Sequence, residues 1–153
     1  MATPSRGPVL FLATGCGAGY APFAPGTAGS AVGVLLFCLL APLPLTWYLA
    51  IIVFVTLAAI WCAGKAEKIF GTNDPPQVVI DEIAGQLITL AALPTNWTYL
   101  VGGFLLFRLL DIIKPWPANT INRDMHGGAG IVLDDVVVGV YANLVLQVAR
   151  TIL

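Results

Sequence analysis

The sequence contains few charged side chains, and this scarcity is its most informative absence. Charged residues make up 10% of the 153 residues, whereas hydrophobic residues make up 58%, and the mean hydropathy is +0.89. No charged side chain occurs between Gly7 and Gly64. This composition is typical of an integral membrane protein and argues against an ordinary soluble domain. The net charge of -1 gives no basis for nucleic-acid binding, so none is expected.

Cysteine and histidine are also scarce, and their scarcity excludes several kinds of site. The three cysteines form no C-x-x-C pair, so neither a disulfide framework nor a zinc site is expected. No cysteine is followed six positions later by arginine, and no D-x-D-x-[TV] motif occurs. The single histidine, His126, cannot supply a two-histidine phosphatase. Any phosphate chemistry in this chain must therefore depend on carboxylates and a metal ion.

Five apolar segments lie between the stretches that carry charge: 28–41, 45–64, 83–93, 97–113 and 135–153. In lipid each must be helical, because only a helix satisfies its own backbone groups there. Short proline-containing turns join the first segment to the second and the third to the fourth, which is typical of helical hairpins. We therefore predict one all-α domain over residues 1–153, a polytopic membrane bundle of four to five apolar helices in two hairpins plus a C-terminal helix.

The lengths of the segments refine this prediction. The segment 45–64 measures roughly 30 Å as a helix, which is enough to cross a bilayer core. Segments 28–41 and 83–93 measure only roughly 16 to 21 Å and are short for a full crossing. Glycines and prolines interrupt the apolar stretch that follows Arg6, so a cleavable signal peptide is not expected.

Basic residues gather at the ends of the segments that lie opposite the two proline turns. They are Arg6, Lys65, Lys68, Lys114 and Arg123. An excess of lysine and arginine marks the cytoplasmic side of a membrane protein. The connections 65–82 and 114–134 are therefore predicted to lie together on the cytosolic face, and the acidic residues beside them are expected to form one cluster there.

Two pairs of adjacent carboxylates, Asp81 with Glu82 and Asp134 with Asp135, precede apolar segments. Each pair is predicted to lie where a helix begins, because the helix dipole favours negative charge at that end. Helix capping alone would explain one acid at each start. Two acids at each of two starts favour a functional role for at least one member of each pair. Adjacent helical residues point about 100° apart, so one member is expected to face a site and the other to support it or face solvent.

Asp111 lies near the C-terminal end of an apolar segment, where the helix dipole disfavours a carboxylate. An ionisable group near membrane depth is a candidate functional residue. Arg108 lies three residues earlier on the same helical face, so an internal ion pair is the simpler alternative. Arginine also binds phosphate through its planar fork of donors. Lys114 precedes two prolines and is expected to be held on a stiff turn near Asp111.

These acids favour a divalent cation bound at one face. Carboxylate ligands without paired cysteine or histidine indicate Mg²⁺ rather than Zn²⁺. Mg²⁺ in proteins is usually completed by a substrate phosphate, so an anionic substrate is expected. The candidate catalytic residues and metal ligands are Asp81, Glu82, Asp111, Asp134 and Asp135, and Arg108 and Lys114 are candidate phosphate-binding residues.

The segment GYAPFAPGTAGSAVG offers a second candidate phosphate contact. Its glycines, Thr27 and Ser30 lead into an apolar helix, and a helix N-terminus binds anions. Thr27 or Ser30 could instead cap that helix. A lone histidine in a loop is more often a structural hydrogen-bonding group, so His126 is only a secondary candidate for an acid or an orienting residue.

Four stretches together resemble the phosphatidylglycerophosphatase A family of bacterial inner-membrane lipid phosphatases: GAGYAPFAPGTAGS, VVIDEIAGQ, FRLLDIIKPWP and GGAGIVLDDVVVGVYA. They occur in family order between Gly15 and Asn143. The resemblance implies Mg²⁺-dependent removal of the terminal phosphate of phosphatidylglycerophosphate, giving phosphatidylglycerol in phospholipid biosynthesis. It places the family's acidic motifs at Asp81, Glu82, Asp111, Asp134 and Asp135. Val138 departs from the alanine common in the family but removes no charged group.

Residue chemistry alone leaves two other functions open. One is a phosphatase acting on a different lipid phosphate, such as phosphatidate. The other is a small ion-binding membrane transporter, in which intramembrane aspartate and arginine residues form a relay. The pattern leaves open the oligomeric state, the number of metal ions, and which acid is a metal ligand and which a base or nucleophile.

Overall fold

A computed structural model describes residues 6–152 of the chain. Within this range the chain forms seven α-helices and one 3-10 turn, and no strand. The elements are α1 (Arg6–Ala13), η1 (Ala18–Tyr20), α2 (Pro25–Leu40), α3 (Leu45–Phe70), α4 (Ile80–Leu90), α5 (Trp97–Ile113), α6 (Ala118–Asp124) and α7 (Gly127–Ile152). The all-α prediction is confirmed. Helices α1 and α6 are short additions that the apolar pattern did not predict.

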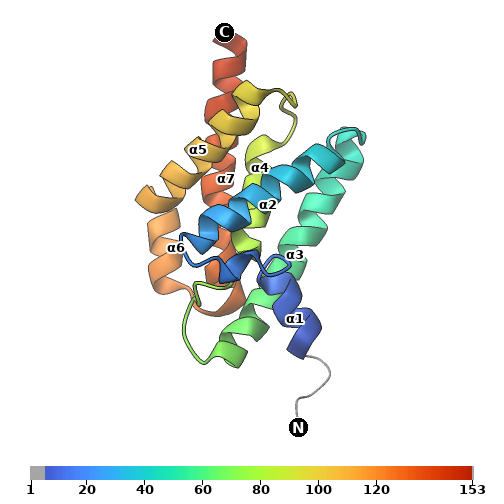
Figure 1. Cartoon of the computed structure of the whole chain (residues 1–153). Helices are drawn as coiled ribbons and strands as arrows, with labels where there is room; N and C mark the ends of the chain where they lie inside the picture. The colour runs from blue at the N-terminus through green and yellow to red at the C-terminus, as the bar shows by residue number, and fades with distance from the viewer. Residues whose placement is uncertain (1–5, 153) are drawn as a thin grey trace.

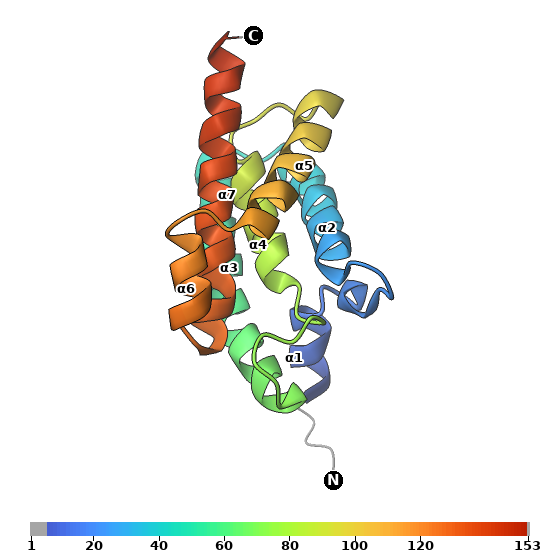
Figure 2. The same ribbon diagram turned by 90° about the vertical axis from the view of Figure 1, so that its left-hand side faces the viewer.

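Helix α4 forms the centre of the molecule and packs against α2, α3, α5 and α7 (Figures 1 and 2). Nine of its eleven residues are buried. An eleven-residue helix is about 16 Å long, which is too short to cross a bilayer. The segment 83–93 is therefore a core helix surrounded by its neighbours, and it begins three residues earlier than predicted. Helices α2 and α3 diverge from their turn, and α4 contacts both of them.

A close contact between α4 and α7 positions the acidic residues. A Cβ atom added to Gly139 of α7 would lie 2.5 Å from the carbonyl oxygen of Gly85, and one added to Gly85 of α4 would lie 2.9 Å from the carbonyl oxygen of Asp135. Only glycine allows the two backbones to approach so closely. This approach brings the first turn of α4 beside the third turn of α7.

Helices α3 and α7 are long and apolar enough to cross a membrane. Each has 26 residues and measures about 39 Å. Only 22% of the most apolar stretch of α3 is buried inside the molecule, so most of this helix faces outward. Large apolar side chains such as Phe54 of α3, Leu105 of α5 and Val148 of α7 are exposed. This outer surface is typical of a protein that contacts lipid.

The start of α7 differs from the sequence-based prediction. Asp134 and Asp135 were expected to open the last helix, but α7 begins at Gly127, seven residues before Asp134. Glycine is a poor helix former in isolation. Here the glycine-rich first turn lies against α3, where an added Cβ on Gly128 would be 2.7 Å from the backbone nitrogen of Gly64. Tertiary packing therefore extends the helix through residues that were predicted to form a loop.

The connections are distributed between the two ends of the bundle. The turns that join α2 to α3 and α4 to α5 lie at one end, and α1, the 71–79 connection and α6 lie toward the other (Figure 1). The polar connections therefore share one end, as the charge pattern predicts.

Candidate functional site

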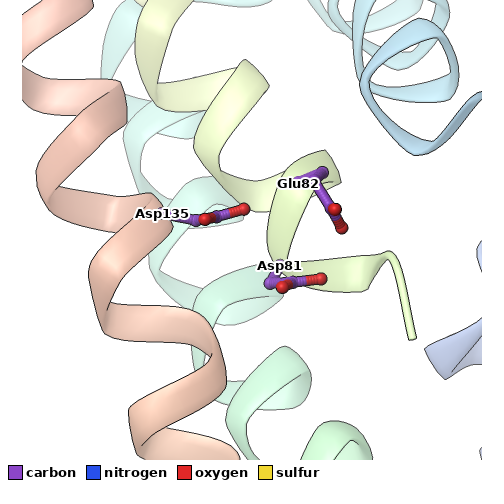
Figure 3. A group of neighbouring side chains, drawn as sticks. All are labelled: Asp81, Glu82 and Asp135. Atoms are coloured by element: carbon purple, nitrogen blue, oxygen red, sulfur yellow. The ribbon is translucent and has the colours of Figure 1, made fainter. Parts of the chain in front are cut away.

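Three carboxylates from two helices form the centre of the candidate site. One oxygen each of Asp81, Glu82 and Asp135 lies within 4.8 Å of the others. Asp81 and Glu82 project from the first turn of α4, and the side chain of Asp135 extends toward them from α7 (Figure 3). Asp81 and Asp135 are 7% and 2% exposed. We refer to these three residues as the carboxylate trio.

Each member of the carboxylate trio has a buried oxygen with no hydrogen-bond partner among residues 6–152. These atoms are Asp81 Oδ1, Glu82 Oε2 and Asp135 Oδ2. Burying a carboxylate oxygen without a partner is costly, and gathering several such charges adds repulsion. A bound cation would remove both costs. The oxygen-only donor set suits Mg²⁺.

Two cations lie beside the carboxylate trio and are held together by Asp111. Arg108 Nη1 donates to Asp111 Oδ2 at 2.8 Å, and Lys114 Nζ lies 3.4 Å from Asp111 Oδ1. Arg108 Nη1 also lies 3.9 Å from Glu82 Oε1. The predicted ion pair between Arg108 and Asp111 is thus present, and it also brings Arg108 to the carboxylate trio. Arg108 Nε is buried and makes no hydrogen bond within the described part of the chain.

Asp134 binds Lys114 rather than joining the carboxylate trio. Its Oδ2 accepts from Lys114 Nζ at 2.5 Å and from Asn122 Nδ2 at 3.0 Å. Burial alone would lower the pKa of Lys114, but the carboxylates of Asp134, Asp135 and Asp111 raise it above its ordinary value. Lys114 therefore stays protonated and acts as a fixed positive charge.

The two acidic pairs behave differently. Asp134 and Asp135 diverge, as expected for adjacent helical residues: Asp135 joins the carboxylate trio, and Asp134 holds Lys114. Asp81 and Glu82 were expected to diverge in the same way, but both contribute an oxygen to the trio. Both residues lie in the first turn of α4. The side chain of Glu82 has one more methylene group than that of Asp81, so it reaches the same point from a different direction.

The N-terminus of α2 adjoins the site. A Cβ added to Gly26 would overlap Glu82 Oε1 and lie 3.1 Å from both terminal nitrogens of Arg108. Thr27 follows in the same turn and is partly exposed. Ser30 is fully buried, and its Oγ donates to the carbonyl oxygen of Gly26 at 3.0 Å. The structure therefore brings the turn of Thr27 to the site. The hydroxyl group of Ser30 instead donates its proton to a carbonyl oxygen of its own helix.

His126 is exposed and lies in a small pocket with Glu67 and Asp74. Asn122 had no sequence signal, because it lies in the unpredicted helix α6. Gln86 is fully buried, and neither polar atom of its side chain has a partner in the described range. Its position four residues after Glu82, on the same helical face, is a signal that sequence reasoning missed.

Comparison with known proteins identifies the family. The model of the family described as Phosphatidylglycerophosphatase A matches residues 11–150. Proteins named phosphatidylglycerophosphatase A from Escherichia coli strain K12 and Haemophilus influenzae are 39% and 36% identical to this chain. Each alignment covers 91% of this chain, with 81% of the first relative and 86% of the second.

A third relative carries a different name. A protein of Bacteroides thetaiotaomicron with the provisional name phosphatidylinositol-3-phosphatase is 42% identical over 161 residues, which cover 100% of this chain and 99% of the relative. No solved structure matches the chain. The family model covers nearly the whole sequence, and the chain belongs to the phosphatidylglycerophosphatase A family.

Proposed function

We propose that the protein removes the terminal phosphate of phosphatidylglycerophosphate and releases phosphatidylglycerol in phospholipid biosynthesis. The observation that carries this proposal is the juxtaposition of the carboxylate trio with the cations Arg108 and Lys114. The trio suits a metal ion, and the cations suit a phosphate. Family membership supports the choice of substrate.

Mg²⁺ is the proposed cofactor, and Asp81, Glu82 and Asp135 would hold it. The fit rests on their buried oxygens without partners and on the excess of acid, because five carboxylates lie in or beside a site that contains two cations. When bound, the ion would polarise the phosphoryl group and make an attacking water more acidic.

The side chains of the protein would orient the phosphate and offset its charge. Arg108 and Lys114 donate toward the phosphate oxygens, where charge accumulates in the transition state. Asp111 fixes both cations, and Asp134 with Asn122 fixes Lys114. The backbone at the N-terminus of α2, beside Thr27, adds a favourable dipole for the anion.

A carboxylate that the metal does not require would accept the proton of the attacking water. The rival route attaches the phosphoryl group to an aspartate. Trapping with labelled substrate distinguishes the two routes, because only the rival leaves a labelled protein after rapid acid quenching.

We further propose that the chain is a multi-pass protein of a bacterial inner membrane, with α2, α3, α5 and α7 in contact with lipid and the site facing the cytosol. Exposed apolar side chains along these helices support the lipid contact. The basic residues near the site end, including Lys65 and Lys68 in the last turns of α3, support this orientation. A lipid phosphate could then keep its acyl chains in the bilayer while its headgroup enters the site.

Phosphate release from a panel of purified lipid phosphates tests the proposal. We expect phosphatidylglycerophosphate to be hydrolysed with the highest kcat/KM, EDTA to abolish release, and added Mg²⁺ to restore it. The panel includes phosphatidate and phosphatidylinositol 3-phosphate. The Bacteroides relative favours the latter as a second candidate substrate. A higher kcat/KM for phosphatidylinositol 3-phosphate would replace the proposed substrate, and undiminished release in EDTA would exclude the metal.

Asn122→Ala is expected to lower kcat/KM about tenfold, because Asp134 loses a hydrogen bond and holds Lys114 less precisely. Asn119→Ala is the matched control, since Asn119 is exposed on the same short helix and its side-chain oxygen accepts only from the neighbouring Thr120. The measurement is steady-state phosphate release by both variants. Equal activity of the two variants would contradict the role given to Asn122.

A further inference from the structure

An apolar cavity opens between α2 and α5, two helices that lie side by side in both views (Figures 1 and 2). Its volume is about 310 Å³. Its lining includes Ala31, Val34 and Leu35 of α2 and Trp97, Val101 and Phe104 of α5. Leu35, Trp97 and Val101 are 66%, 80% and 48% exposed, so the cavity opens to the outer surface. We call it the α2–α5 groove.

The lining of the α2–α5 groove continues along α5 to Arg108. Val101, Phe104 and Arg108 are spaced i, i+3 and i+7, which places them on one face of a helix. Phe104 lies one helical turn before Arg108. The face of α5 that lines the groove therefore ends at a cation of the candidate site.

The lining on α2 leads to the same end. Thr27, Ala31 and Val34 are spaced i, i+4 and i+7 and also share one helical face. Gly26, in the turn of Thr27, lies against Arg108, because an added Cβ there would be 3.1 Å from both terminal nitrogens of that side chain. Two apolar stripes on neighbouring helices thus converge on the polar groups proposed to bind phosphate.

We propose that the α2–α5 groove holds one acyl chain of the lipid phosphate substrate while its phosphate lies at Arg108 and Lys114. This inference rests on the proposed function. The occupant follows from the continuity of the groove with the site: an apolar channel that ends at a phosphate-binding cation suits a molecule with a phosphate at one end and a hydrocarbon chain at the other. Trp97 lies eleven residues before Arg108, so the groove extends along about 16 Å of helix.

The groove acts by orientation rather than by affinity. Lipid tails are as apolar as the side chains that line the groove, so moving a chain from the bilayer into it yields little hydrophobic free energy. A seated chain does restrict the direction from which the headgroup enters. A displacement of about 1 Å at a reacting group can cost on the order of 100-fold in rate, so this restriction has a measurable effect.

A second apolar cavity, of about 440 Å³, lies between α2 and α3, and its lining includes Leu36, Val55 and Ile83. The close contact of α2 with α4 separates it from Arg108. A Cβ added to Gly33 would lie 2.7 Å from the Cβ of Gln86, which shows how closely the two helices approach. This cavity is larger, but none of its lining residues belongs to α5, which carries Arg108, so we assign the substrate chain to the α2–α5 groove.

The test compares a diacyl substrate with its deacylated form in tryptophan variants. Val101→Trp fills the far part of the groove, about 10 Å along α5 from Arg108, and a substrate without acyl chains has no hydrocarbon to place there. Val53→Trp is the matched control, because Val53 is also an exposed valine on an apolar helix and lines neither cavity. Val55→Trp fills the rival cavity. Phosphate release is measured from dioleoyl phosphatidylglycerophosphate in mixed micelles and from glycerophosphoglycerophosphate, its deacylated form, at the same detergent concentration.

We expect Val101→Trp to lower kcat/KM for the dioleoyl lipid about tenfold and to leave the value for the deacylated substrate within about twofold. Val53→Trp and Val55→Trp should leave both values unchanged. Equal losses on both substrates would show that Val101 is only structural, and a loss confined to the dioleoyl lipid in Val55→Trp would assign the chain to the other cavity. Either result, or full activity of Val101→Trp, would overturn the inference. No release from either substrate by the unsubstituted protein would instead refute the proposed function, and the inference with it.

Discussion

Asp135→Asn is expected to reduce phosphate release by about 1,000-fold or more. Asp135 is 2% exposed, has one buried oxygen without a partner among residues 6–152, and completes the carboxylate trio with Asp81 and Glu82. An asparagine keeps the shape of the side chain but removes the charge that a metal ion requires. The measurement is kcat/KM for phosphatidylglycerophosphate over a range of Mg²⁺ concentrations.

The same substitution should not destabilise the metal-free protein. The carboxylates of the trio repel one another when no cation is bound, so neutralising Asp135 removes an unfavourable interaction. The thermal unfolding midpoint in detergent and EDTA is therefore expected to stay level or rise. Activity and stability that fall together would indicate that Asp135 is mainly structural, and unimpaired activity would remove it from the proposed metal site.

Asp124→Asn provides the matched control. Asp124 lies at the end of α6, its side chain is 53% exposed, and it pairs with Arg123 at 2.7 Å on the surface. An exposed ion pair contributes little to stability, and this one lies outside the site. We expect both the activity and the unfolding midpoint of Asp124→Asn to match those of the unsubstituted protein.

The sequence predicted the acidic cluster better than it predicted helix α7, which carries two of the five carboxylates. Carboxylates are rare in this apolar chain, so each one is a candidate functional residue. Their positions relative to the two proline turns indicated that they lie at the same end of the helix bundle. The role of each individual carboxylate was harder to predict from the sequence. Asp134 and Asp135 are adjacent and identical in type, and only the direction of α7 shows that Asp135 meets α4 and Asp134 meets Lys114.

The bounds and the burial of the helices were also only partly predictable from the sequence. Apolar length predicted both ends of α5 and the start of α3, but α3 continues six residues beyond the predicted segment 45–64, through charged residues that ended the apolar run. It did not predict that α4 would be buried, since a lipid-facing helix and a core helix have the same composition. It also missed the first turns of α7, where Gly127 and Gly128 argue for a loop by propensity and form a helix only because α3 lies against them.

Gly128→Ala tests whether this contact sets the position of α7. A Cβ at residue 128 would overlap the carbonyl oxygen of Ile60 and lie 2.7 Å from the backbone nitrogen of Gly64, and neither backbone atom can move without shifting α3. We expect a destabilisation of about 3 kcal/mol, or a fall of about 10 °C in the unfolding midpoint. Differential scanning fluorimetry in detergent measures it.

Gly102→Ala is the control, because a Cβ added to this helical glycine of α5 would have no neighbouring atom within 4 Å. Its midpoint should be unchanged or slightly raised, since alanine favours a helix over glycine by up to about 1 kcal/mol. Gly128 and Asp135 lie seven residues apart on one face of α7, so displacing the first turn also moves Asp135 relative to α4. Gly128→Ala should therefore lose stability and phosphate release together, whereas Asp135→Asn should lose release alone. A Gly128→Ala protein as stable as Gly102→Ala would show that the close contact between α3 and α7 does not position the site.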